Sequence, residues 1–374
     1  MTQSRTDISV SCTALSPVCE RVARWSRIRS VSREEQSLAD EVHRELAALG
    51  FQARRDGNNV WCEFGDATRP RLLLNSHIDT VPPAAGWSGD PWNVRIESDR
   101  VIGLGVNDAK GCGASLVETA VRIQRARDAG ERCDATIVLA LTAEEEISGQ
   151  GLSAVLPRLQ PLDAAIVGEP TGLAPMIAQR GLLVLRCVAR GRTGHPANTP
   201  ADTPNNAIAN AAADIARLRG INWEPPHAVL GAIHAHVTMI AGGVARNVVP
   251  DSCEFWVDVR TTPTLSHREI VERVRAALSC EVNIHSERLT PIETAADEPI
   301  VRAAVVASGN PPAGSRTMSD MVFLRGVPSV KIGPGESIRS HTPDEFVMMH
   351  ELTRGVDVYE KLIHEFTARW AQRD

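Results

Sequence analysis

The sequence lacks several features that define broad classes of protein. No apolar run approaches the roughly 18 residues of a membrane-spanning helix. The N-terminal segment MTQSRTDISVSCTALSPVCERVARW is too polar for a signal peptide, so we expect a cytoplasmic protein. Basic residues are not in excess, because the net charge is −6 and the pI is near 6.0. This balance argues against nucleic acid or an anionic membrane surface as the main partner.

Cysteines at metal-binding spacing are also missing. The eight cysteines are dispersed, with no CxxC pair, which argues against a thiolate zinc finger and against a secreted disulfide framework. We expect most of them to be small buried hydrophobic residues, without a direct role in chemistry. They are Cys12, Cys19, Cys62, Cys112, Cys133, Cys187, Cys253 and Cys280.

A chain of 374 residues is too long for one ordinary hydrophobic core, so we expect about two domains. A capping box of Ser32 and Glu35 predicts a helix that closes at Gly50. Alternation of strands and helices in this part predicts an α/β domain with a largely parallel sheet flanked by helices. Apolar runs typical of strands buried on both faces lie at 71–79, 135–142 and 163–170, and a helical segment lies at 114–130.

The middle of the chain has a different pattern. Its order of elements is β-α-β-β-α-β, which predicts an inserted ferredoxin-like domain over 178–291. The α/β pattern then resumes, so the other domain is expected to combine 1–177 with 292–374. The predicted strands of the insert are 181–191, 235–243, 251–263 and 281–287, its helices are 204–219 and 266–279, and helices at 299–308 and 349–371 and a strand at 327–332 follow.

Polar side chains collect where the strands of the α/β part are predicted to end. Each has an ordinary alternative, because a lone histidine is usually structural, Asp108 could cap a helix and Glu169 could be a turn residue. Ligand sites in open α/β sheets lie outside the carboxyl ends of the strands. We therefore expect all of these residues at one edge of one sheet. They are His77 and Asp79, Asp108, Glu144 to Glu146, Glu169, and His341.

The residue types favour a metal site. Histidines with carboxylates and no thiolate suit zinc, with cobalt or manganese as substitutes. Asp108, Glu146, Glu169 and the two histidines are more ligands than one catalytic metal needs. Two metals about 3.5–4 Å apart that share one carboxylate would use them all. Two dications would also remove the cost of clustering several carboxylates.

The motifs SHIDTVPP, GLGVNDAKG, TAEEE, GEPT, GRTGHPA and SHTPDEF occur in this order between Leu74 and Phe346. Together they resemble the M20 family of dinuclear zinc amidohydrolases, and most of all its acetylornithine deacetylase and succinyl-diaminopimelate desuccinylase group. The inserted unit resembles the lid and dimerisation domain of that family. Leu104 and Ala109 stand where the family often has Arg and Met, but neither position is a ligand.

The resemblance implies a role for each site residue. Asp108 would bridge two zinc ions, and the other metal ligands would be His77, Glu146, Glu169 and His341. Asp79 would orient His77, and Glu145 would be the general base.

On the lid, His195 would stabilise the oxyanion, often in the partner subunit's site, and Arg260 would hold the substrate carboxylate. By the same resemblance, Asn247 would line the site.

The resemblance also implies a reaction. We expect hydrolysis of N-acetylornithine to ornithine and acetate, a step of arginine biosynthesis, by a homodimer joined through the lid. N-acetylcitrulline, N-succinyl-diaminopimelate, or another N-acyl amino acid or dipeptide are alternative substrates. A non-catalytic zinc-binding scaffold is a more remote alternative. Glu144 has no expected role. Adjacent strand residues point oppositely, so the chain must leave strand geometry for Glu145 and Glu146 to face the metals together.

Overall fold

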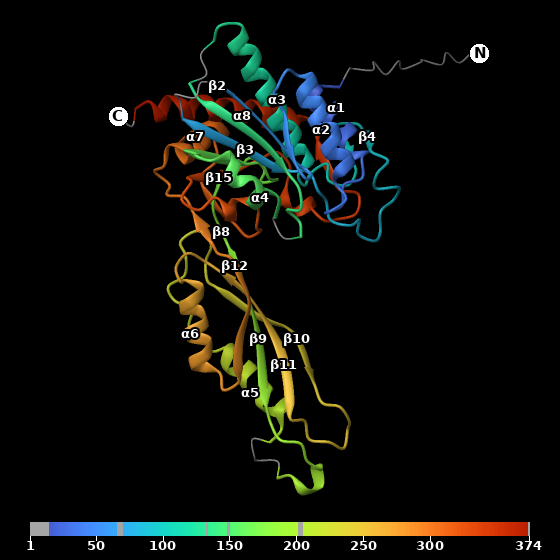
Figure 1. Ribbon diagram of the computed structural model, residues 1–374, viewed down its shortest axis with the longest axis vertical. Helices are drawn as coiled ribbons and strands as arrows, with labels where there is room; N and C mark the ends of the chain where they lie inside the picture. The colour runs from blue at the N-terminus through green and yellow to red at the C-terminus, as the bar shows by residue number, and fades with distance from the viewer. Residues whose placement is uncertain (1–14, 66–69, 132–133, 148–149, 201–204, 373–374) are drawn as a thin grey trace, which may run out of the picture.

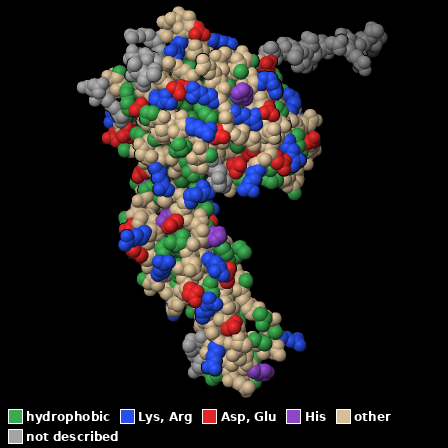
Figure 2. Space-filling model, in the orientation of Figure 1, with side chains coloured by type: hydrophobic (Ala, Val, Ile, Leu, Met, Phe, Trp, Pro, Cys, Tyr) green, Lys and Arg blue, Asp and Glu red, His purple; other side chains and the backbone are tan. Residues whose placement is uncertain are grey.

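The computed structural model describes residues 15–372 apart from 66–69, 132–133, 148–149 and 201–204 (Figure 1). A wide α/β unit, which we call the body, carries the first and last helices. An elongated unit, which we call the arm (residues 181–289), extends from one side of it, as the space-filling view in Figure 2 also shows. Among the described residues, no helix is long and apolar enough to cross a membrane.

A nine-stranded sheet forms the centre of the body, in the order β1-β2-β6-β3-β7-β15-β8-β13 with β14 paired to β8. The central strands β6, β3, β7 and β15 are parallel, whereas β2 and β8 pair antiparallel with them. The bounds are β1 (Arg54–Asp56), β2 (Asn59–Gly65), β3 (Arg71–His77), β6 (Thr136–Thr142), β7 (Ala164–Val167), β8 (Met176–Gln179), β13 (Ile292–Glu293), β14 (Ala313–Ser315) and β15 (Ser329–Lys331). The predicted α/β fold with a largely parallel sheet is confirmed.

Helices cover both faces of this sheet. Leu72 and Leu74 of β3 pack into one buried cluster, and Leu73 between them packs into another on the opposite face. This explains why the central strands are continuous apolar runs. The first cluster includes α1 (Pro17–Ser26), α2 (Gln36–Ala48), α3 (Lys110–Asp128), α7 (Pro299–Ser308) and α8 (Met349–Trp370), and the second includes α4 (Gln150–Leu159) and the short helix η2 (Asp320–Phe323).

A separate three-stranded sheet, β16-β5-β4, lies beside the main one. Its strands are β4 (Arg95–Glu97), β5 (Arg100–Ile102) and β16 (Phe346–Met348). We expected the strand before Asp108 to belong to the same sheet as the other site strands, and this expectation is wrong. β5 pairs with β4 and β16 and not with the central sheet, so Asp108 approaches the site from a loop.

The predicted capping box of Ser32 and Glu35 is also wrong. Helix α2 begins at Gln36, and Glu35 makes no side-chain cap bond. The Ser32 hydroxyl instead donates to Asp79 Oδ2 at 2.7 Å. Glu35 is fully buried and accepts from the backbone N–H groups of Arg33 and Glu144. Both side chains therefore bond to groups outside the helix, which a local pattern does not reveal.

The arm is a four-stranded antiparallel sheet in the order β10-β11-β9-β12, with its own buried core. Helix α5 contacts β9 and β11, and α6 contacts β12, so both helices lie on the sheet (Figure 1). This order confirms the ferredoxin-like unit. The bounds are β9 (Gly181–Arg190), α5 (Ala207–Leu218), β10 (His234–Gly242), β11 (Ser252–Thr261), α6 (His267–Ala277) and β12 (Glu281–Leu289).

The arm joins the body at a narrow neck, where the chain enters from β8 and returns to β13 (Figure 1). A Cβ atom on Gly181 would lie 2.4 Å from the backbone nitrogen of Pro291 and 2.6 Å from the carbonyl oxygen of Leu289. The two crossing segments therefore touch, and only glycine fits at this position. The domain boundaries at 178 and 291 stay predictions.

Candidate active site

Three of the predicted site segments lie at the carboxyl ends of neighbouring parallel strands. His77 is the last residue of β3, Glu145 and Glu146 follow the end of β6, and Glu169 follows the end of β7. Parallel neighbours end at the same edge of a sheet, so these side chains meet there. Asp108 and His341 reach the same place from loops, one before α3 and one after the short helix η3 (Ser337–Arg339).

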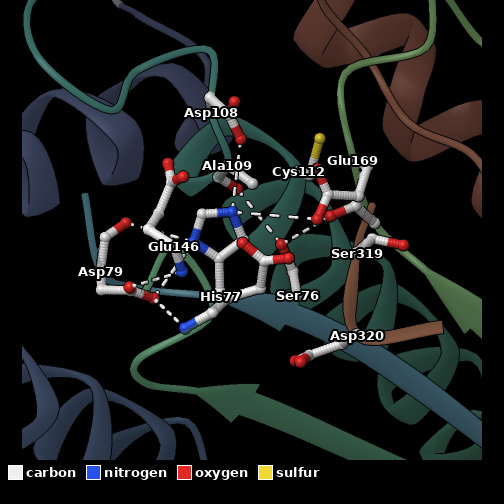
Figure 3. A network of polar contacts seen from close by, with 12 residues as sticks. Ser76, His77, Asp79, Asp108, Ala109, Cys112, Glu146, Glu169, Ser319 and Asp320 are labelled. Carbon is white, nitrogen blue, oxygen red and sulfur yellow. Dashed lines mark hydrogen bonds and ion pairs between the residues drawn. The ribbon is translucent and has the colours of Figure 1, made fainter. Parts of the chain in front are cut away.

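The Asp108 carboxylate lies between the two histidines. Its Oδ1 is 3.3 Å from His77 Nε2, and its Oδ2 is 3.7 Å from His341 Nε2. Each histidine also has a glutamate of its own, because Glu169 Oε1 is 3.8 Å from His77 Nε2 and Glu146 Oε1 is 3.0 Å from His341 Nε2. Figure 3 shows Asp108, Glu146 and Glu169 arranged around His77. The arrangement has two halves that share one carboxylate.

This donor set fits metal ions. In two groups of three residues, the potential ligand atoms lie within 4.8 Å of one another. One group is His77, Glu145 and Glu169, and the other is His77, Asp108 and Glu146. All the donors are imidazole nitrogens and carboxylate oxygens, which suit zinc, cobalt or manganese. A carboxylate with one oxygen toward each histidine is the form that a bridging ligand takes in a two-metal site.

We call this group of side chains the cluster; it consists of His77, Asp108, Glu145, Glu146, Glu169 and His341. The ionisation of the cluster supports the same interpretation. Burial raises the pKa of Glu145 well above its usual value, and the neighbouring carboxylates Glu169, Asp320 and Glu146 raise it further. Burial also raises the pKa of Glu169 to about 8. The acids therefore resist ionising together in this space. Dications bound among them would favour the charged forms.

Asp79 organises both the histidine and the glutamate turn. Its Oδ1 lies 3.3 Å from His77 Nδ1 and accepts from the backbone N–H of Glu145 at 3.1 Å. Its Oδ2 accepts from the backbone N–H of Glu146 at 3.1 Å and from the Ser32 hydroxyl. One buried carboxylate therefore fixes the ring of one candidate ligand and the backbone of two more candidate site residues, as supporting carboxylates do in metal sites.

The chain leaves strand geometry immediately after β6, which is needed for Glu145 and Glu146 to face the cluster together. Glu144 has a φ of 56°, in the left-handed region, and a turn follows over 145–147. The Glu144 N–H donates to the Glu35 carboxylate at 3.2 Å, and the Glu144 carboxylate lies 3.9 Å from Arg33 Nε. Glu144 therefore makes the bend and faces away from the cluster.

A cavity of about 250 Å³ opens onto the cluster and is lined by Asp108, Glu145, Glu146, Glu169 and His341. A second cavity, of about 470 Å³, adjoins it and includes Glu145, Glu146, His341 and Arg260. Arg260 comes from β11 of the arm, and its guanidinium forms a bidentate pair with Asp258 at 2.8 and 3.2 Å. The structure thus brings Arg260 to the site, between the arm and the body.

The sequence pattern of peptidase family M20/M25/M40 matches residues 73–365. The chain belongs to this family. It is therefore an amide-bond hydrolase, and the predicted family is confirmed.

Relatives extend the match over most of the chain. N-acetyl-L-citrulline deacetylase of Xanthomonas campestris is 28% identical over 88% of this chain and 91% of its own. Acetylornithine deacetylase of Myxococcus xanthus is 28% identical over 89% of this chain and 93% of its own. The crystal structure of the Bacillus subtilis YXEP protein, a dinuclear metal-binding peptidase of the M20 family, superposes with a TM-score of 0.71 at 17% identity. It covers 92% of this chain and 96% of that one.

Two predicted residues of this M20 chain lie far from the cluster. His195 and Asn247 are exposed on loops beyond the ends of β9 and β10, at the end of the arm remote from the neck. The adjoining strand β11 has ten residues, and at about 3.3 Å per residue it spans about 30 Å. Neither residue lines the cavities at the cluster. The His195 ring instead accepts a bond from the backbone of Ala197 at 3.2 Å.

Several supporting residues were not predicted from the sequence. Glu345 is buried and accepts from the backbone N–H groups of Asn107 and Asp108, so it holds the Asp108 loop. Lys331 is buried near Glu169 and donates to the backbone and hydroxyl of Thr317. The position of Glu345 in the SHTPDEF motif, four residues after His341, was an available signal. Lys331 had none, since a lysine ending a short strand has no pattern of its own.

Proposed function

We propose that this enzyme hydrolyses the amide bond of a small N-acyl amino acid at a two-zinc site, with cobalt or manganese as possible substitutes. The observation that carries the proposal is the Asp108 carboxylate, which presents one oxygen to each of two histidines. His77 and Glu169 would hold one metal, and His341 and Glu146 the other. The naming of relatives as acetylornithine and acetylcitrulline deacetylases supports amide hydrolysis of this type.

When bound, the metals would polarise the scissile carbonyl and allow water to lose a proton near neutral pH. Glu145 lines the cavity, and burial raises its pKa well above the usual value. In the proposal it accepts the proton of the attacking water and then delivers it to the leaving amine. The bonds from Asp79 to the turn keep the Glu145 backbone fixed while the proton moves.

The remaining proposed roles belong to the arm. Arg260, at the near end, binds the substrate carboxylate, and Asn247 lines the site when the arm is placed over it. His195 stabilises the oxyanion. Since His195 lies at the far end of its own arm, we propose that residues 178–291 form a lid and dimerisation domain, and that the histidine is supplied by the partner subunit.

The first substrate to test is N-acetylornithine, which would place the enzyme in cytoplasmic arginine biosynthesis. N-acetylcitrulline, N-succinyl-diaminopimelate and a dipeptide complete a panel for colorimetric amine release. We expect release from at least one member by metal-loaded protein, loss on chelation, and recovery when zinc is restored. A metal-replete protein that cleaves none of them would contradict the proposal and favour a non-catalytic zinc-binding scaffold.

A further inference from the structure

An exposed arginine, Arg316, lies in the wall of the larger cavity beside the cluster. Arg316 follows β14 and lines the 470 Å³ cavity together with Glu145, Glu146 and Arg260. Arg260 forms a bidentate pair with Asp258, as described above. Arg316 is exposed, and within the described part of the chain its guanidinium has neither a hydrogen bond nor an ion pair. A cationic group is therefore available in the wall of the cavity.

The segment that carries Arg316 is firmly held. The Ser315 hydroxyl donates to the Thr317 carbonyl at 2.9 Å. Lys331 Nζ donates to the Thr317 hydroxyl at 3.0 Å. Farther along, Ser319 donates to Gln179 at 2.7 Å, and Asp320 accepts from Thr142 at 2.8 Å. Anchors on both sides of Arg316 fix its backbone, so the cation is presented from a prepared position, as in a specific binding site.

The surroundings of Arg316 are positive. The pKa of Arg180 is lowered by burial and then by the charges of Arg316 and Arg260. The pKa of His234 is lowered by burial and by Arg180, His236 and Arg316. Like charges in one region raise the affinity for an anion and oppose a cation.

The 470 Å³ cavity is lined by as many acids as arginines, two of each. The acids lining the 470 Å³ cavity are Glu145 and Glu146, which both belong to the metal cluster. A neighbouring cavity of about 270 Å³ contains Glu336, but Arg316 and Lys331 line it as well. In this smaller cavity the two cations outnumber the one anion.

We infer that Arg316 is a specificity-determining residue that binds a second carboxylate of the substrate, on its side chain or acyl group. The inference rests on the proposed function and narrows it to dianionic N-acyl amino acids. Arg260 takes the carboxylate at one end of the substrate and Arg316 the one at the other. A substrate with a cationic side chain, such as N-acetylornithine, is then disfavoured. Charge-assisted bonds to a guanidinium are strong enough to set such a preference.

The test uses three compounds with the same acetyl group and α-carboxylate: N-acetyl-L-glutamate, N-acetyl-L-glutamine and N-acetyl-L-ornithine. We expect kcat/KM of the metal-loaded enzyme to be about tenfold to a hundredfold higher for the glutamate than for the glutamine compound, and lowest for the ornithine compound. Arg316→Gln should reduce the glutamate-to-glutamine ratio to about one. Arg316→Glu should raise the ornithine compound above the glutamate one.

Arg302→Gln is the matched control, because Arg302 is exposed on α7 and lines neither cavity. It removes the same charge and should keep the wild-type ratio. A glutamate preference that survives Arg316→Gln would overturn the inference. The inference would also be overturned if the wild type preferred the ornithine compound and Glu336→Gln abolished that preference.

If the wild type hydrolyses none of the three, the proposed function fails for these substrates. The inference is then decided by calorimetric binding of the same compounds to wild type and Arg316→Gln. Tighter binding of the glutamate compound that depends on Arg316 supports it, and equal binding overturns it.

Discussion

The metal cluster and the far end of the arm differ in how their predicted residues are held. At the cluster, His77 is buried, and the turn with Glu145 and Glu146 is bonded through its backbone to Asp79. At the end of the arm, His195 and Asn247 are exposed on loops. Proton transfer and metal binding need fixed geometry, and one chain provides it. In the proposed function, the residue that stabilises the oxyanion would arrive later, with a second subunit or a moving domain.

The largest effect is expected at the cluster itself. Glu145→Gln should lower kcat by about 10³-fold or more, because a general base contributes up to about 10⁴-fold. It should leave the metal content unchanged. Glu146→Ala should instead lose metal, so mass spectrometry after dialysis separates the two roles. A metal-replete Glu145→Gln enzyme with normal kcat would show that another group is the base.

The second prediction concerns the end of the arm. His195→Ala should lower kcat by about 10²–10³-fold, the usual effect of removing one oxyanion donor. Mixed with Glu145→Gln protein under conditions of subunit exchange, it should regain activity, since one site of the mixed dimer would have both residues. Light scattering checks that dimers form. Absence of recovery in proven mixed dimers would mean that His195 acts within its own chain.

The third prediction compares the cluster with and without metal. Burial raises the pKa of Glu169 from 4.5 to about 8, and the hydrogen bond to Glu146 raises that of His341 from 6.5 to about 9. Groups with a higher pKa in the folded state bind more protons when folded, so their stabilisation is lost as pH rises. The Tm of metal-free protein should fall between about pH 5 and 9, and reloading with metal should reduce the fall, because metals bind deprotonated ligands. If the Tm of the metal-free protein were the same across this pH range, the prediction would be wrong.

The smallest effect is expected at Glu144, the outward member of the three glutamates. Its carboxylate and the Arg33 side chain are 34% and 74% exposed, so their pairing contributes at most about 1 kcal/mol. Glu144→Asn, a residue that tolerates left-handed backbone, should leave kcat within about twofold and metal content unchanged. Loss of metal from this variant would show that Glu144 belongs to the cluster.

The sequence was most informative where chemistry follows local pattern. The apolar runs before His77, Glu145 and Glu169 predicted strands, and the parallel order of these strands explains why the three residues meet. The long-range supports were not predictable in this way. Glu35 is 109 residues from Glu144, and its position next to a helix resembled an ordinary cap. Only tertiary packing decides whether Ser32 bonds to a helix end or to Asp79.

Because the neck is narrow, a small rotation there would move the far end of the arm much more than its near end. The two crossing segments of the neck touch at Gly181 and Pro291, and the sheet of the arm extends about 30 Å from that point. A rotation of about 10° at the neck would carry the far end by about 5 Å, while Arg260 near the pivot would hardly move. In the proposed function, substrate contacts made through Arg260 would therefore depend little on the angle of the arm, whereas the position of His195 would depend on it strongly.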